Sequence, residues 1–115
     1  MSEDHKHRAR IFLHRGDLVQ ARAAWEAAVT DDRASSNSQA LSASLGNLGN
    51  TCALMNDLLP AEQCYREVLQ IQRTEGNLTA VAHTLVNLGN LQIAADHPEH
   101  ARPYYLEALD LMRTL

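Results

Sequence analysis

The sequence predicts an all-α fold in which three antiparallel helix pairs stack into a solenoid. Residues 44–50 read Ser-Leu-Gly-Asn-Leu-Gly-Asn, and residues 84–90, forty positions later, read Thr-Leu-Val-Asn-Leu-Gly-Asn. A fixed period of this length is the signature of a repeat architecture. Apolar residues within the period recur at helical spacing. Aromatic residues make up only 4% of the chain, so that small and aliphatic side chains supply most of the apolar surface, which favours closely packed helices.

The forty-residue period extends beyond these two stretches and back to the start of the chain. Tyrosine recurs at positions 65 and 105, and Trp25 stands at the same position of a weaker first unit. His7 and Arg10 replace the asparagines in that unit. We therefore expect one domain over 1–115, with repeats over about 2–36, 37–76 and 77–115.

Composition and charge exclude several classes of protein. A formal charge of −4 argues against a nucleic-acid-binding protein, which holds phosphates with an excess of basic side chains. The charge is uneven, since residues 1–33 hold six Lys and Arg against six Asp and Glu, while the remainder holds four against eight. No run approaches the roughly 20 apolar residues of a membrane-spanning helix, and the N-terminus lacks the apolar region of a signal peptide. We expect a cytoplasmic protein without membrane insertion.

The first repeat predicts two helices and a long loop. Ser2 is a suitable N-cap, so the first helix is expected over about 3–15. Gly16-Asp17 ends it, and the second helix follows over about 18–31. Residues 31–38 read Asp-Asp-Arg-Ala-Ser-Ser-Asn-Ser, and small polar side chains of this kind compete with helical backbone for hydrogen bonds. This segment is therefore expected to be a loop.

The second repeat predicts two further helices, over about 38–55 and from Pro60 to about Thr74. Proline is tolerated in a first helical turn because the N–H that it lacks has no partner there. Asn56-Asp57 separates the two helices. Apolar residues in the first of them step by four, three, four and three, which marks one face of a helix. These residues are Leu41, Leu45, Leu48, Cys52 and Met55.

The third repeat predicts a helix over about 78–95 and a last helix that begins at Asp96-His97-Pro98 and reaches the C-terminus. Gly76 is a suitable C-cap before the first of them. Pro103 lies where the last helix is already expected to be under way, and an interior proline removes one helical hydrogen bond. We therefore expect the last helix either to begin later or to bend on its solvent side.

The repeated units resemble the tetratricopeptide repeat, which has a small residue in its first helix and an alanine and an aromatic residue in its second. Gly49, Ala61 and Tyr65 stand at these family positions. The resemblance implies a right-handed superhelix that binds other proteins. A glycine allows close approach of the second helix, which explains the pattern physically. Forty-residue units that read Asn-Leu-Gly-Asn are similar to the subfamily that includes kinesin light chain and LGN, a spindle-orientation scaffold.

Four asparagines are the main candidate ligand contacts. In a solenoid of helix pairs the first helices line the concave side, and asparagines three residues apart share one helix face. An amide offers donors and an acceptor to an extended peptide. The resemblance implies a row of such asparagines along the groove, an asparagine ladder. The alternative is that the amides join loops or neighbouring helices, or cap a turn. The candidates are Asn47, Asn50, Asn87 and Asn90, with His83 on the same face.

Lys6 and Arg10 are candidate contacts for acidic residues of a partner, because they give the first helix a positive charge. Solvated surface side chains are the alternative interpretation. The carboxylate clamp of some tetratricopeptide repeats is similar to this chain at Lys6 and Asn47. It differs where Arg10, His83 and Asn87 stand in place of the residues that the clamp requires, so the likeness to a clamp is weak.

Catalysis, cofactors and metals are not expected. None of the common metalloprotease, phosphate-loop or nucleophile-elbow motifs occurs. His97, Glu99 and His100, near Asp96, could form an adventitious metal site, whereas solvated side chains are the simpler interpretation. Cys52 and Cys64 fall at apolar positions, which favours reduced packing residues over a disulfide between neighbouring helices.

The function predicted from these features is that of a protein-interaction adaptor, whose concave groove binds an extended peptide segment of a partner. A sensor of a small peptide signal would use the same groove. The alternative is a scaffold that associates with itself. The last helix ends in residues 109–115, Leu-Asp-Leu-Met-Arg-Thr-Leu, without a polar capping helix. An uncovered apolar face favours association, so the chain is either a fragment of a longer array or pairs as a homo-oligomer.

Overall fold

The computed structural model describes residues 2–115 and is all-α over that range; Met1, with which the expected domain begins, lies outside it. Six helices form three antiparallel pairs, which confirms the predicted fold class. The helix boundaries fall within a few residues of those expected. The helices are α1 (Ser2–Arg15), α2 (Leu18–Ala34), α3 (Ser38–Leu54), α4 (Leu58–Glu75), α5 (Leu78–Ala94) and α6 (Pro98–Thr114).

The five turns between the described helices share one backbone feature. Each contains one residue in the left-handed region, with φ between 57° and 80°. Such a residue ends a helix by turning the chain away from the helical path. The residues recur every twenty positions, so each forty-residue repeat contains two turns of the same kind. They are Gly16, Ser36, Asn56, Gly76 and Asp96.

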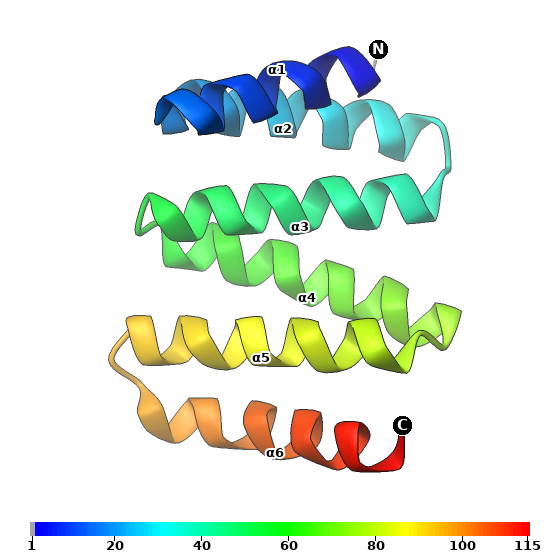
Figure 1. The fold of residues 1–115 in the computed structure, drawn as a ribbon, viewed down its shortest axis with the longest axis vertical. Helices are drawn as coiled ribbons and strands as arrows, with labels where there is room; N and C mark the ends of the chain where they lie inside the picture. Colours follow the sequence, from blue (N-terminus) through cyan, green and yellow to red (C-terminus); the bar gives the residue numbers. More distant parts are fainter. Residues whose placement is uncertain (1) are drawn as a thin grey trace.

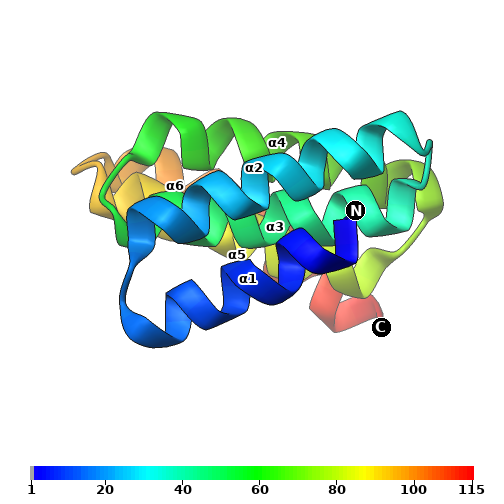
Figure 2. The ribbon, with the colours of Figure 1, turned by 90° about the horizontal axis from the view of Figure 1, so that it is seen from above.

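The helices stack in chain order along the longest axis of the molecule, from α1 at one end to α6 at the other (Figure 1). Seen along that axis, α2 and α4 lie on the same side of α1 and α3 (Figure 2). In these two pairs the first helices thus form one layer and the second helices another. The extents of 38 × 31 × 19 Å fit a short stack of three pairs.

The core runs through the stack between the two layers. Its larger cluster spans α1 to α5 and includes Leu45, Leu48 and Cys52, three of the residues predicted from the stripe of the third helix. A smaller cluster of Val81, Leu85 and Ala108 joins α5 to α6. The stack is therefore held together by apolar burial at both junctions between repeats.

An aromatic ring rests on a small residue within the second and third repeats. A Cβ atom built on Gly49 would lie 2.8 Å from Cε1 of Tyr65, and one built on Gly89 would lie 2.5 Å from Cε1 of Tyr105. Both distances are shorter than packed carbon atoms allow. Ala9 and Trp25 occupy the same positions in the first repeat, and both are buried. The prediction that the small residue permits close helix approach agrees with these contacts.

The predicted loop over residues 31–38 is wrong, because α2 continues to Ala34 and only residues 35–37 form the turn. Asp32 lies inside the helix and is buried. Hydrogen bonds from Ser2 and Ser44 hold its carboxylate, at 2.6 Å each. These long-range contacts replace the local side-chain bonds that favour a loop. The hydroxyl of Ser2 therefore donates to Asp32 of α2 instead of capping its own helix.

Pro103 lies within α6, which begins at Pro98, so the later start that we considered is wrong. The side chain of Pro103 is exposed. On the solvent side the backbone carbonyl that loses its helical donor can bond water instead. This position limits the cost of an interior proline.

Candidate functional site

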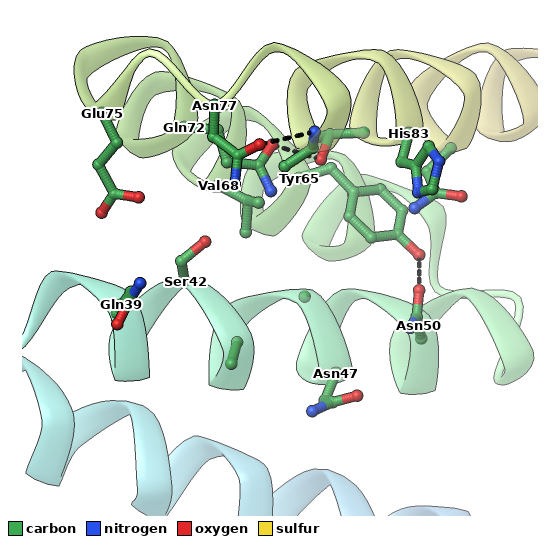
Figure 3. A pocket seen from close by; sticks show the side chains of 15 residues that line it. Gln39, Ser42, Asn47, Asn50, Tyr65, Val68, Gln72, Glu75, Asn77 and His83 are labelled. Atoms are coloured by element: carbon green, nitrogen blue, oxygen red, sulfur yellow. Dashed lines mark hydrogen bonds between the residues drawn. The ribbon is translucent and has the colours of Figure 1, made fainter.

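A cavity of about 470 Å³ lies at the junction of the second and third repeats, between α3, α4 and α5. Both first helices of these repeats contribute to it, and α4, a second helix, contributes as well. Figure 3 shows Gln39 and Glu75 at one end, and Asn50, Tyr65 and His83 toward the other. The lining residues are Gln39, Ser42, Ala43, Gly46, Asn47, Asn50, Tyr65, Val68, Gln72, Glu75, Asn77, Ala80, His83, Thr84 and Asn87.

Asn47 and Asn87 lie at the same position of consecutive first helices and both line the cavity. Each is half-buried. Neither side-chain amide has a hydrogen-bond partner among the described residues, although the backbone carbonyl of Asn47 accepts a bond from Thr51 at 2.9 Å. Buried amides are normally paired. Two half-buried amides without partners therefore leave donors and acceptors available to a ligand.

Asn50 and Asn90 are engaged within their own repeats. The hydroxyl of Tyr65 donates to Oδ1 of Asn50, and the hydroxyl of Tyr105 donates to Oδ1 of Asn90 at 2.6 Å. Burial raises the pKa of Tyr65 to about 12, so this hydroxyl keeps its proton. Asn50 lines the cavity with its amide nitrogen still available, whereas Asn90 is not among the lining residues. The side-chain oxygens of both asparagines thus join neighbouring helices, which is the alternative role considered for them.

The first repeat replaces this pair with a different one. Arg10 stands at the position of Asn50, and its guanidinium carbon lies 5.8 Å from the ring centroid of Trp25. A cation–π contact thus occupies the place of the tyrosine–asparagine bond. The buried Nε1 of Trp25 has no hydrogen-bond partner. Arg10 lies outside the cavity, and its charge is directed to the indole ring.

Lys6 is buried at the junction of the first and second repeats, with 7% of its surface exposed. Its Nζ atom lies 3.4 Å from Oδ2 of Asp32 and 3.4 Å from Oε1 of Glu3. Burial raises the pKa of Asp32, but hydrogen bonds from Ser2 and Ser44 and the charge of Lys6 outweigh it and bring the pKa below 3.8. Lys6 is therefore part of a buried ionic cluster, and it does not line the cavity.

Eleven of the fifteen lining residues were not among the predicted contacts, and Tyr65, Gln72, Glu75 and Thr84 are four of these. The Oγ1 atom of Thr84 donates to Oε1 of Gln72 at 2.7 Å. Oγ of Ser38 donates to Oε1 of Glu75 at 3.1 Å. The forty-residue period relates the Thr84–Gln72 hydrogen bond to the one between Ser44 and Asp32, because Gln72 and Thr84 stand forty residues after Asp32 and Ser44.

Several other features lie apart from the cavity. His97, Glu99 and His100 have ligand atoms within 4.8 Å of one another, and all three side chains are exposed. Both cysteines are free thiols, and burial raises the pKa of Cys64 to about 11. Over the range that the structure covers, no helix has the length and apolar character that crossing a membrane would require.

Comparisons with known proteins agree with the repeat architecture. Two family models, each described as the tetratricopeptide repeat, match residues 4–74 and residues 82–113. Among curated proteins, none matches the chain. The finer likeness to the subfamily of kinesin light chain and LGN stays a prediction. Since the first match alone covers more than half of the chain, the protein belongs to the tetratricopeptide repeat family.

Proposed function

We propose that the chain is an adaptor module that binds an extended segment of a partner protein in the cavity between α3, α4 and α5. Tetratricopeptide repeats are in general non-enzymatic modules for protein–protein interaction. The observation that carries the finer proposal is the pair Asn47 and Asn87. Both are half-buried on the cavity wall, lie in register one repeat apart, and have unpaired side-chain amides.

The two amides suit the backbone of an extended peptide. Each side-chain amide offers two N–H donors and one carbonyl acceptor, which matches the alternating groups of a main chain. A hydrogen bond of this kind contributes about 0.5–1.5 kcal/mol net. Two such residues cannot supply strong binding alone, so side-chain contacts within the cavity must add to them.

The experiment uses a random peptide library displayed on phage, selected on the immobilised chain. Peptides that are enriched are then synthesised, and their affinity is measured by fluorescence anisotropy for the wild type and for Asn47→Ala/Asn87→Ala. We expect the double variant to lose at least about tenfold in affinity, since two hydrogen bonds are removed. Far-UV circular dichroism and thermal melting are expected to stay unchanged.

Gln70→Ala provides the matched control, because Gln70 is an exposed amide on α4 that does not line the cavity. This control is expected to bind the selected peptides like the wild type. No enrichment on the wild type would overturn the proposal of a peptide-binding groove. Equal affinity for the wild type and the Asn47/Asn87 double variant would show that these two asparagines do not contribute to peptide binding.

A second candidate function, self-association, is favoured by the outer face of α6. Leu106, Leu109 and Met112 are 48%, 43% and 46% exposed. Leu109 stands forty residues after Leu69, a residue of α4 that packs against both core clusters. A contiguous apolar face of this kind favours association. Light scattering distinguishes the cases, because a mass of 12.7 kDa at every concentration would exclude self-association.

A further inference from the structure

One position of the repeat is filled in the first unit and empty in the second. In the first unit, Lys6 of α1 is buried at the junction with the second repeat, and its amine lies beside Asp32. Forty residues later the corresponding residue is Gly46, which lines the cavity. A Cβ atom built on Gly46 would meet nothing within 4 Å. The cavity therefore lies where the second unit lacks the side chain that the first unit possesses.

A hydrogen bond from a hydroxyl lies beside this position in both junctions, with a carboxylate as acceptor in the first and an amide in the second. Ser44 donates to Asp32 at 2.6 Å in the first junction, and Thr84 donates to Gln72 at 2.7 Å in the second. The hydroxyl and its acceptor thus occupy the same places in both. The second junction lacks the long side chain of the first, and its acceptor is an amide in place of a carboxylate. It therefore leaves open the space at Gly46.

The fixed charge of the cavity is negative. Among its described lining residues Glu75 is the only carboxylate, and none is Lys or Arg. Ser38 holds one oxygen of Glu75 at 3.1 Å, which places the carboxylate at the cavity end formed by the start of α3. A ligand carboxylate would meet this charge without a basic partner, whereas a ligand ammonium would be attracted to it.

The cavity walls suit the aliphatic part of a lysine. Ala43, Val68 and Ala80 line it beside Gly46, and lysine side chains bury their methylene groups along apolar surface while the amine reaches a polar partner. The carbonyl oxygens of asparagine and glutamine side chains can accept from the amine. Lys6 shows a related arrangement inside the protein, with its stem buried and its amine beside Asp32. The residue that corresponds to Asp32 in the cavity is Gln72, and the carboxylate of the cavity is that of Glu75.

We propose that this cavity binds a lysine side chain of the partner segment, and that Gly46 is the residue that admits it. The inference rests on the proposed peptide-binding function and names the residue class that the groove selects. Asn47 and Asn87 hold the backbone of the segment, while Glu75 faces the inserted amine. The expectation of an acidic partner came from Lys6 and Arg10, whose charges are directed to Asp32, Glu3 and Trp25 instead.

The test uses five pools of heptapeptides, randomised except for a central Lys, Arg, Gln, Glu or Leu. Binding of each pool to the isotope-labelled chain is followed by NMR titration. We expect the Lys pool to bind about fivefold more tightly than the Gln pool, the size expected for one partly exposed ion pair. The largest shifts are expected at the amides of Gly46 and Thr84. Preference for the Glu pool or the Leu pool would overturn the proposal.

Two variants probe the site itself. Gly46→Lys/Gln72→Asp rebuilds the Lys6–Asp32 pair in the second repeat and is expected to abolish the preference for Lys, with the fold intact by circular dichroism. Gln70→Lys adds the same charge on α4 outside the cavity and is the matched control. Glu75→Gln is expected to make the Lys and Gln pools bind alike. An unchanged Lys preference in Gly46→Lys/Gln72→Asp would contradict the proposal.

The outcomes separate this inference from the proposed function. If Asn47→Ala/Asn87→Ala weakens all five pools but the central residue makes no difference, the groove binds peptides and the lysine site is wrong. If the Lys pool is preferred and Asn47→Ala/Asn87→Ala has no effect, the lysine site stands without the asparagine ladder. Failure of every pool to bind the wild type would overturn both.

Discussion

The α2–α3 junction and the α4–α5 junction have the same backbone plan but different side chains at three corresponding positions. The first contains Lys6, Asp32 and Ser44 as a buried ionic cluster. Forty residues later the second contains Gly46, Gln72 and Thr84, with a cavity in place of the lysine side chain. The exchange of Asp32 for glutamine accompanies the loss of lysine, so neither junction has a buried charge without a partner. One position thus holds a buried ion pair in one repeat and borders an open cavity in the next.

The largest expected effect comes from breaking the cluster of the first junction. Lys6→Ala leaves the buried carboxylate of Asp32 without its positive partner, and breaking a buried ion pair in this way costs about 3 kcal/mol. The measurement is the free energy of unfolding in urea, followed by far-UV circular dichroism. Lys6→Ala/Asp32→Asn should recover part of the loss because the stranded charge is removed. An unchanged urea midpoint for Lys6→Ala would contradict the cluster.

A smaller effect is expected from pH, because acid neutralises the carboxylate of Asp32 rather than leaving it stranded. The pKa of Asp32 is lowered in the folded chain from its ordinary 3.8. Its contribution to stability is therefore full above pH 3.8 and is lost as the pH falls from there through the folded-state pKa. The check compares urea unfolding of the wild type and Asp32→Asn across this range. The difference between them should shrink in acid, and a constant difference would contradict the assignment.

Two glycines of α3 provide the next comparison, since one lies against a ring and the other faces the cavity. Gly49→Ala would press a methyl group on the buried ring of Tyr65, and overpacking of this kind costs about 1–2 kcal/mol. Gly46→Ala meets open space and should stabilise the helix by about 0.5–1 kcal/mol. Thermal melting measures both. Equal shifts of the melting temperature in the same direction would show that the two positions do not differ.

The ring contacts of the first and second repeats differ in kind and should differ in response. Asn50→Ala leaves the hydroxyl of Tyr65 without its acceptor, at a cost of about 1 kcal/mol. Arg10→Ala removes the cation from the face of Trp25, at about 0.5 kcal/mol for an exposed side chain. Urea unfolding gives both costs. The emission of Trp25, the single tryptophan, should change in Arg10→Ala and stay the same in Asn50→Ala.

Much of the fold followed from periodicity, because backbone and packing requirements recur at fixed spacing. The forty-residue period located the helices and the small residues beneath the rings, as at Gly49. The same period related Asn47 of α3 to Asn87 of α5, and both line the cavity. What repeats in the sequence is what every unit needs for packing, and this part could be predicted from residues alone.

Partners distant in the chain could not be predicted in the same way. Asp32 stands in a polar run that suggests a loop, and the residues that hold it, Ser2, Lys6 and Ser44, come from two other helices. The hydroxyl that engages Asn50 likewise lies on the following helix. A hydropathy pattern does not indicate which polar side chains form hydrogen bonds or ion pairs with each other. The repeats do offer one indication that Lys6 and Asp32 are partners. Both residues are replaced together forty positions later, by Gly46 and Gln72.

The smallest expected effect concerns a feature that both junctions share. Arg33 of α2 pairs with Glu67 of α4 at 2.6 Å, and Arg73 of α4 pairs with Glu107 of α6 at 2.8 Å. All four side chains are at least 38% exposed. Exposed pairs of this kind contribute about 0.2–1 kcal/mol, and salt screens them. The two pairs occupy equivalent positions of successive repeats.

Glu67→Gln and Glu107→Gln should therefore cost about the same, near 0.5 kcal/mol each, and the cost should fall in high salt. Urea unfolding at low and high ionic strength measures both. Glu62→Gln is the control, because Glu62 pairs with Arg66 inside α4 and joins no two helices. Equal costs for Glu67→Gln and Glu107→Gln would indicate that the surface pairs between α2, α4 and α6 contribute uniformly along the stack. The difference in stability between the junctions would then come from the exchange of Lys6 and Asp32 for Gly46 and Gln72. Unequal costs would show that the surface pairs contribute to that difference.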